Sequence, residues 1–265
     1  HYLMTTTTAN AVGVFRHLEF VRQCLRPDLD VQIISVTDSW AQFAVAGPNS
    51  RRVLQTLVDP QFDISNEGFP FMACANITIC GGTAARLFRI SFSGELAYEI
   101  AVQSRYGDAL IRALMEAGEP FDITPYGTEA LAVMRIEKGH VTSNEINGMI
   151  TALNLGMKQM VSVKKDFIGA VLSRRKGMVN EDGLRLVGLE AVDPEGVVTA
   201  GAHLFADGVP VDAANDQGYV TSAAYSPHLK ASIGLGFITR GDARHGEIAH
   251  AMNPLEGRRA RVRIV

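Results

Sequence analysis

The sequence predicts an α+β protein in which antiparallel strands mix with helices and a small C-terminal β-barrel follows. In the first two-thirds of the chain, apolar residues at helical spacing alternate with short segments rich in β-branched residues. After that, short strand-like segments are separated by Gly, Pro and Asp-Gly turns, with no helix of useful length. A chain of 265 residues, 47% of them hydrophobic, is long enough for one large domain or two smaller ones.

The elements of the first part follow no regular βαβ order. The opening Tyr-Leu-Met-Thr-Thr-Thr-Thr is rich in β-branched residues and predicts a strand, and apolar residues at helical spacing then predict a helix that ends before Pro27. A Gly-Pro-Asn-Ser turn leads into a further helix, and Gly81-Gly82 joins two strands as a hairpin. In chain order, we predict a strand at 2–8, a helix at 9–25, strands at 31–37 and 40–46, a helix at 50–57, strands at 75–80, 84–92 and 96–102, and helices at 106–118 and 128–138.

The second part is predicted to consist of short strands joined by turns. These strands are expected at 184–191, 200–205, 219–225, 232–238 and 258–265. The pattern changes within the sequence GMVNEDG at residues 177–183. We therefore predict two domains, residues 1–180 and residues 181–265.

Charge and composition argue against several classes of partner. The net charge is −3, from 25 basic and 28 acidic residues, so bulk electrostatics does not favour nucleic acid or an anionic membrane. No apolar run reaches the roughly 18 residues of a membrane span, and the N-terminus lacks the features of a signal peptide. The three cysteines, an odd and sparse number, suit a reducing compartment and are expected to be small buried hydrophobes. We therefore expect a cytoplasmic protein with no nucleic-acid or membrane partner.

The common catalytic and nucleotide-binding motifs are missing from these residues. There is neither a GxGxxG after a strand nor a GxxxxGK[ST], and Ser93 lies in SFSGE rather than in a GxSxG turn. His245 and His250 are five residues apart without an HExxH frame, so we predict no metal site. No catalytic residue is assigned from the sequence.

Three separated segments resemble one family. They are FAVAGPNSR at 43–51, RISFSGELAYE at 89–99 and GTEALAVMRIEKG at 127–139, and FIG at 167–169 and GYVTSAAYSPHL at 218–229 add support. In this order they are similar to segments of the folate-binding aminomethyltransferases typified by the glycine-cleavage T-protein. The resemblance implies a folate-binding aminomethyltransferase-like domain followed by a β-barrel, and tetrahydrofolate as ligand.

Within that family, the opening HYLMTTTTANA and the segment AVMRIEKG are most similar to the C-terminal part of the alpha subunits of heterotetrameric sarcosine oxidases. This resemblance implies that an upstream dinucleotide-binding region and the first stretch of the folate domain are absent here. It also implies a flavin-bearing beta subunit and smaller subunits as partners. FAD or FMN and NAD are then expected on those partners or on the upstream region. One carbon from sarcosine would reach tetrahydrofolate on this chain.

Three candidate folate contacts lie in the second matched segment. Glu95 matches the family glutamate that binds the pterin, and a carboxylate can accept two N–H hydrogen bonds from that edge; the alternative is an exposed turn glutamate. Phe92 stands where the T-protein has a tyrosine, and it suits either stacking on the folate or core packing. Tyr98 shares a face with Phe92 if the strand alternates without a bulge, although a strand tyrosine is usually a core residue.

Three further candidates lie elsewhere. Arg135 matches the family arginine of the third segment, and a guanidinium suits the carboxylates of the folate tail; the alternative is an ordinary solvated arginine. Thr6 and Thr8 point to one side of the first predicted strand, which in the family ends beside the pterin. Their alternative is simple β-propensity.

One departure from the family bears on the reaction. Residues 9–14 (ANAVGV) contain no acid, whereas the T-protein has an aspartate at this place that is thought to act on the folate. We therefore expect capture of a free imine or formaldehyde rather than T-protein-like transfer, with proximity as the main contribution. The alternatives are a free-standing glycine-cleavage aminomethyltransferase and a degenerate, non-catalytic family member that serves as a scaffold.

Overall fold

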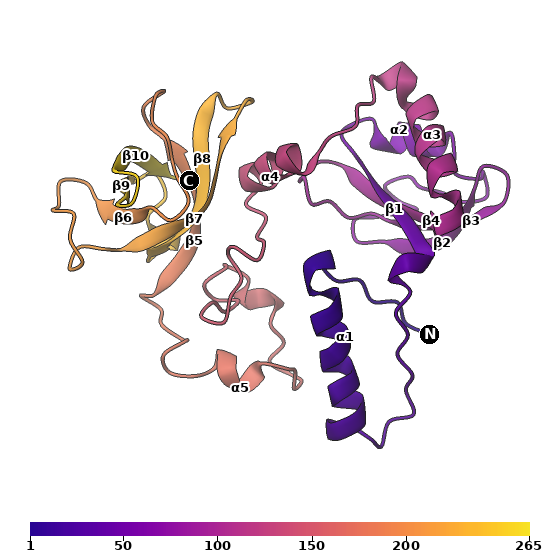
Figure 1. Cartoon of the computed structure of the whole chain (residues 1–265), viewed down its shortest axis with the longest axis horizontal. Coiled ribbons are helices and arrows are strands. Elements are labelled where there is room, and N and C mark those ends of the chain that lie inside the picture. The colour runs from indigo at the N-terminus through magenta and orange to yellow at the C-terminus, as the bar shows by residue number, and fades with distance from the viewer. The chain divides into compact units, whose positions relative to one another are not determined.

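The computed structural model describes residues His1 to Val265 and divides into two compact units. The sheet unit comprises residues 1–45, 52–89 and 99–121, and the barrel unit comprises residues 46–51, 90–98 and 122–265. Figure 1 shows both units with their elements labelled. None of the helices is both long and apolar enough to cross a membrane. The predicted domain boundary at residues 180 and 181 stays a prediction.

The sheet unit is built on four strands in the order β1-β4-β3-β2. Their bounds are Trp40–Ala46 for β1, Cys74–Ile79 for β2, Thr83–Phe88 for β3 and Ala97–Gln103 for β4. Strand β3 pairs antiparallel with both β2 and β4. Alternate side chains, such as Ile79, Leu87 and Val102, are buried on one face, and helix α3 lies beside the sheet (Figure 1). The predicted strands 40–46, 75–80, 84–92 and 96–102 are therefore confirmed within a few residues.

The helices of both units agree with the periodicity of the sequence. They are α1 at Ala11–Phe20, extended by a π-helical turn at Val21–Leu25, α2 at Ser50–Gln55, α3 at Gly107–Gly118, α4 at Thr128–Glu137 and the short α5 at Ala170–Ser173. Leu110 and Leu114, four residues apart, form the buried side of α3. The four predicted helices are therefore confirmed.

Two predicted strands are wrong. Residues 2–7 have no regular structure and Thr8–Asn10 form a 3₁₀ turn, while residues 31–36 are irregular and Thr37–Ser39 form another such turn. β-branched residues favour extended backbone, but a strand also needs a neighbour that takes its hydrogen bonds. Neither segment has one. A further correction concerns the cysteines, since Cys24, Cys74 and Cys80 are all exposed rather than buried.

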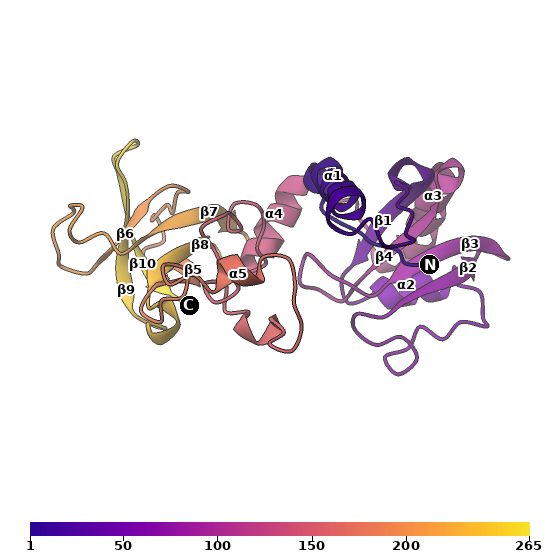
Figure 2. The same ribbon diagram turned by 90° about the horizontal axis from the view of Figure 1, so that it is seen from below.

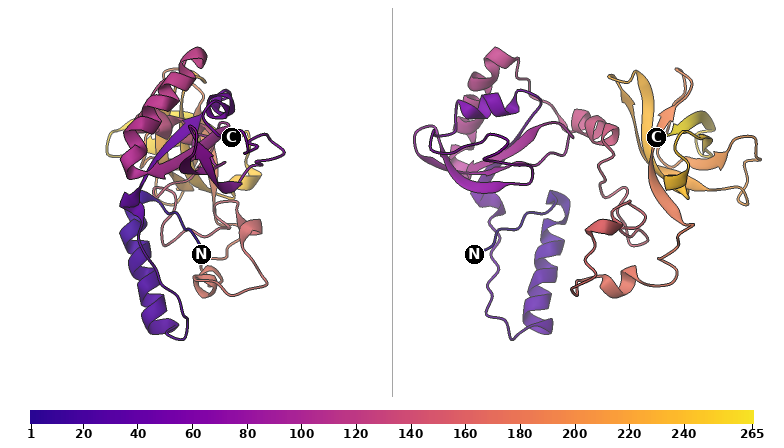
Figure 3. Two further views of the ribbon diagram at one scale, coloured as in Figure 1. Left: turned by 90° about the vertical axis from the view of Figure 1, so that its right-hand side faces the viewer. Right: turned by 180° about the vertical axis from the view of Figure 1, so that it is seen from behind.

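The barrel unit is organised around a closed barrel with the strand order β10-β5-β8-β7-β6-β9. The bounds are Leu184–Ala191 for β5, His203–Ala206 for β6, Gly218–Ser226 for β7, Ala231–Thr239 for β8, Ile248–Asn253 for β9 and Arg258–Ile264 for β10. Figures 2 and 3 show these strands curling around a common interior. Its core contains Leu189, Leu204, Val220, Val262 and Ile264.

Five of the six barrel strands were predicted, and the predicted fold class is confirmed. The missing strand is β9, which pairs with both β6 and β10 and so closes the barrel. Its inward positions are Ala249, Ala251 and Asn253. Small and polar side chains give no apolar alternation, so the sequence pattern carries little signal for this strand.

Candidate functional site

The loop of residues 90–96 brings matched segments of the sequence together within the barrel unit. Its carboxyl end is fixed at the Leu96 carbonyl, which accepts hydrogen bonds from the Gly47 N–H (2.8 Å) and the Ser50 hydroxyl (3.0 Å). Within the loop, the Gly94 N–H donates to Ser91 Oγ at 2.9 Å. The Gly-Pro turn of the first matched segment therefore holds the second segment.

The same loop packs on the carboxyl end of helix α4 and the turn that follows it. The Nδ1 atom of His140 lies 2.7 Å from the Phe92 carbonyl oxygen. The centroids of the His140 and Phe92 rings are 6.0 Å apart, and the ring planes are tilted by 37°. A Cβ atom on Gly94 would come within 2.0 Å of Lys138 Cγ. Only glycine lets the loop approach α4 this closely.

Glu95 and Phe92 present their side chains to solvent from this loop. The side chain of Glu95 is 47% exposed, and Phe92 is 40% exposed. The Lys138 ammonium lies 4.0 Å from Glu95 Oε1 and is equally exposed, so it is a weak partner. The loop thus combines a carboxylate that can accept two N–H donors with an apolar ring that can be stacked upon.

Tyr98 is a core residue with 0% exposure, and its hydroxyl accepts a hydrogen bond from Arg51 Nε at 2.8 Å. Strand β4 begins at Ala97, so the alternation that would place Phe92 and Tyr98 on one face does not extend through the loop. A folate contact by Tyr98 stays a prediction that its burial does not support.

Arg135 lies in a buried network instead of on a solvated face, and it is 5% exposed. Its Nη1 donates to Glu145 Oε2 at 3.0 Å and to the His140 carbonyl at 3.2 Å, and its Nη2 donates to Ser222 Oγ at 2.6 Å. The Ser222 hydroxyl in turn donates to Glu145 Oε1 at 2.6 Å. These partners connect α4 to barrel strand β7. Contact between Arg135 and a folate tail stays a prediction, and this arrangement gives it no support.

Glu145 is fully buried, yet it is held as a carboxylate. Burial alone acts to raise its pKa. Hydrogen bonds from the Ser222 and Thr221 hydroxyls and the Thr142 N–H, together with the charge of Arg135, outweigh burial and lower the pKa below its usual value.

A pH dependence follows from this lowered pKa. Because the folded state binds a proton at Glu145 less readily than the unfolded state does, the carboxylate stabilises the fold above its unfolded pKa, and this contribution is lost as the pH falls. We expect the difference in free energy of unfolding between the wild type and Glu145→Gln to be constant near neutral pH and to shrink as the pH falls below about 5, where the carboxyl group of the unfolded chain begins to take up a proton. Urea titrations of both proteins at several pH values measure it, and a constant difference would contradict the assignment.

Thr6 and Thr8 belong to the sheet unit, where both are exposed and lie outside any strand. Their predicted orientation to one side of a strand therefore has no basis in the structure. A role for them in ligand binding stays a prediction.

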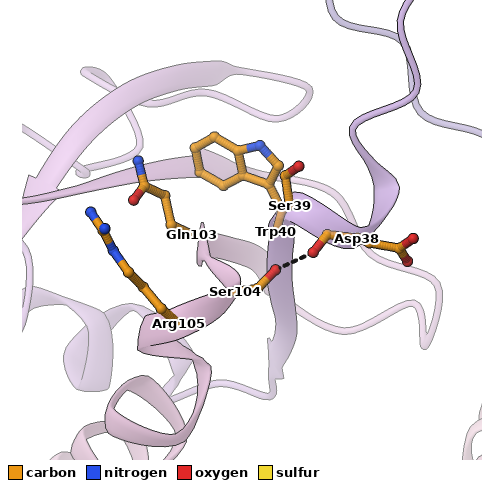
Figure 4. Close-up of a pocket in the computed structure, with 6 residues that line it drawn as sticks. All are labelled: Asp38, Ser39, Trp40, Gln103, Ser104 and Arg105. Atoms are coloured by element: carbon orange, nitrogen blue, oxygen red, sulfur yellow. Dashed lines mark hydrogen bonds between the residues drawn. The ribbon is translucent and has the colours of Figure 1, made fainter.

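A hollow lies in the sheet unit at the start of β1, with a volume of 350 Å³. Figure 4 shows Trp40, Gln103 and Arg105 around it, with the Asp38 carboxylate directed away from them. The Ser104 hydroxyl donates to the Asp38 carbonyl at 2.5 Å. The hollow offers an indole ring and polar groups but no paired acid and base, and it contains none of the predicted site residues.

Neither His140 nor Glu145 was predicted as a site residue, although the structure connects both to the 90–96 loop. A lone histidine gives little signal, because most are surface or satisfied residues. Glu145 stands in a segment without a recognisable motif. The one sequence signal for His140 is its position directly after the matched segment that ends at Gly139.

Comparison with known proteins agrees with this architecture. Residues 1–165 match the GCVT N-terminal domain, and residues 185–265 match the glycine cleavage T-protein C-terminal barrel domain. The chain therefore belongs to the glycine cleavage T-protein family.

Particular relatives refine this assignment. Sarcosine oxidase subunit alpha of Rhizobium meliloti (strain 1021) is 50% identical over 97% of this chain, and the match spans 26% of that protein. The aminomethyltransferase of Geobacillus kaustophilus (strain HTA426) is 32% identical over 100% of this chain and 68% of its own length. The crystal structure of glycine cleavage system aminomethyltransferase T from Bartonella henselae has a TM-score of 0.74 at 22% identity, covering 96% of this chain and 64% of that one. The chain thus spans about a quarter of the alpha subunit that it matches.

Proposed function

We propose that this chain is the tetrahydrofolate-binding part of a sarcosine oxidase alpha subunit. It receives the one-carbon unit released when sarcosine is oxidised, and 5,10-methylenetetrahydrofolate forms on it. The observation that carries this proposal is the 50% identity to a sarcosine oxidase alpha subunit over almost the whole chain, against 32% to an aminomethyltransferase.

In this proposal, the chain's own residues bind and orient the folate. The Glu95 carboxylate accepts hydrogen bonds from the amino-pyrimidine edge of the pterin, and the exposed Phe92 ring packs on the folate. The one-carbon unit arrives as the imine that oxidation of sarcosine produces. Its carbon forms bonds to both reacting folate nitrogens while its double bond to the glycine nitrogen breaks, and the two folate N–H protons end on the departing amine of glycine. Since no acid occurs at residues 9–14, proximity is the main contribution of this chain.

The oxidation itself belongs to other parts of the assembly. A flavin-bearing beta subunit removes the electrons from sarcosine, and smaller subunits complete a hetero-oligomer. FAD or FMN and NAD are bound by those subunits or by the upstream region of the alpha chain. The match to a protein named as a subunit supports the presence of partner subunits.

The first test is a calorimetric titration of the chain with 5-formyltetrahydrofolate, a stable reduced folate. We expect Glu95→Gln to weaken binding at least tenfold, about 1.4 kcal/mol, because an amide replaces one acceptor oxygen by a donor. The matched control is Glu195→Gln, which changes an exposed glutamate in a turn of the barrel unit.

Two outcomes of the titration would change the proposal, and an activity assay of the chain alone tests the free-standing alternative. Equal affinity for the wild type and Glu95→Gln keeps folate binding but removes Glu95 from the site. Absence of binding by the folded wild-type chain contradicts the proposed function and favours the scaffold alternative. Aminomethyl transfer to folate without any partner subunit would favour the free-standing aminomethyltransferase.

A further inference from the structure

We propose that His140 is a positioning residue for the 90–96 loop and that the barrel holds it in place through the buried Arg135–Glu145 pair. This inference rests on the proposed function in so far as the loop binds folate. It gives Arg135 an indirect role in place of the direct contact that the family resemblance implied.

His140 donates a hydrogen bond to the loop. A carbonyl oxygen only accepts, so Nδ1 of His140 must carry the hydrogen that it donates to the Phe92 carbonyl at 2.7 Å. Residues 90–96 form no strand or helix, so few main-chain bonds define their path. The His140 ring also packs against the Phe92 ring. One side chain therefore fixes both the main chain and the ring of Phe92.

Arg135 holds the main chain of His140 in place. Its N–H donates to the Arg135 carbonyl at 2.8 Å, and its own carbonyl accepts from Arg135 Nη1 at 3.2 Å. Arg135 is clamped by Glu145 and by Ser222 of β7. The arginine is thus enclosed between the turn that carries His140 and the barrel wall.

The same hydrogen bonds affect the position of Glu95, the candidate folate contact. Glu95 lies three residues beyond Phe92. It directly follows the turn that contains Phe92, which is closed by the hydrogen bond from the Gly94 N–H to Ser91 Oγ. A shift of the Phe92 carbonyl therefore changes where the Glu95 carboxylate points. A carboxylate that must meet two N–H donors at once is sensitive to such a change.

The test compares His140→Ala with His140→Asn. An asparagine amide can donate to the Phe92 carbonyl from nearly the position of Nδ1, whereas alanine cannot. In the titration with 5-formyltetrahydrofolate, we expect His140→Ala to bind at least fivefold more weakly and His140→Asn to stay within twofold of the wild type. His228→Ala, which removes an exposed histidine of the barrel unit, is the control.

Two further readouts separate positioning from a merely structural role. Amide hydrogen exchange of residues 90–96, measured without ligand, should rise in His140→Ala and not in His140→Asn. Glu95→Gln should reduce folate affinity less in the His140→Ala background than in the wild type, because a misplaced carboxylate already contributes less to binding.

Unchanged exchange in His140→Ala would overturn the inference, whether or not the chain binds folate. Equal losses of affinity in the alanine and asparagine variants would also overturn it, since the hydrogen bond to the Phe92 carbonyl, on which the inference depends, would then contribute nothing to binding. A wild-type chain that binds no folate, with exchange that rises only in His140→Ala, would refute the proposed function and leave the positioning of the loop standing.

Discussion

Replacing Arg135 by methionine is expected to lower the free energy of unfolding by about 3 to 5 kcal/mol. The substitution removes the guanidinium and leaves the carboxylate of Glu145, which is fully buried, without its counter-charge. The cost of an uncompensated buried charge is large because the protein interior cannot solvate it. Urea unfolding at neutral pH, followed by circular dichroism, measures the change.

A matched surface pair provides the control. Arg112 and Asp108 form an ion pair at 2.9 Å on helix α3, and both side chains are 77% exposed. Water already solvates these charges, so Arg112→Met should lower the free energy of unfolding far less than Arg135→Met does. Similar effects of the two methionine substitutions would show that the network around Arg135 does not bury an ion pair.

A double substitution tests the physical cause. Arg135→Met combined with Glu145→Leu removes both charges, so no buried ion is left unpaired. We expect it to recover more than half of the stability lost in Arg135→Met alone. Additive losses in the double variant would instead point to packing as the source of the effect.

Much of the fold could be predicted from the sequence, because most elements carry their own pattern. Strand β5 has buried side chains at every second position, and α3 buries Leu110 and Leu114 on one side. The wrong or missing strands occur where the hydrophobic pattern of the sequence does not determine the structure. The four threonines at 5–8 favour extended backbone but cannot specify a partner strand. In β9 the buried residues are small or polar, so their alternation with exposed residues is not visible as a hydrophobic pattern.

The candidate site shows a similar division. The resemblance identified the segment that carries Glu95, and the structure leaves that carboxylate exposed at the end of a held loop. The partners of Arg135 could not be predicted, because Glu145 is 10 residues away in sequence and Ser222 is 87 residues away. A matched motif records that an arginine is present, and only the fold determines which way it faces.

Replacing Gly218 by alanine is expected to destabilise the barrel by at least about 2 kcal/mol. Gly218 begins β7 and pairs with Ile238 of β8. A Cβ atom there would lie 1.9 Å from the Phe237 carbonyl oxygen and 2.8 Å from the Ile238 Cα. Both atoms are backbone and cannot rotate away, so β7 and β8 would have to separate locally.

Gly13→Ala should raise the free energy of unfolding, whereas Gly218→Ala lowers it, which makes Gly13→Ala a demanding control. Gly13 lies within helix α1, and nothing lies within 4 Å of an added Cβ atom. Alanine there restricts the unfolded chain without a clash, so we expect a gain of about 0.5 to 1 kcal/mol. Urea unfolding of both variants compares them directly. If Gly218→Ala leaves the free energy of unfolding unchanged, the first residue of β7 lies less close to β8 than their pairing implies. The closed barrel would then not depend on this close approach.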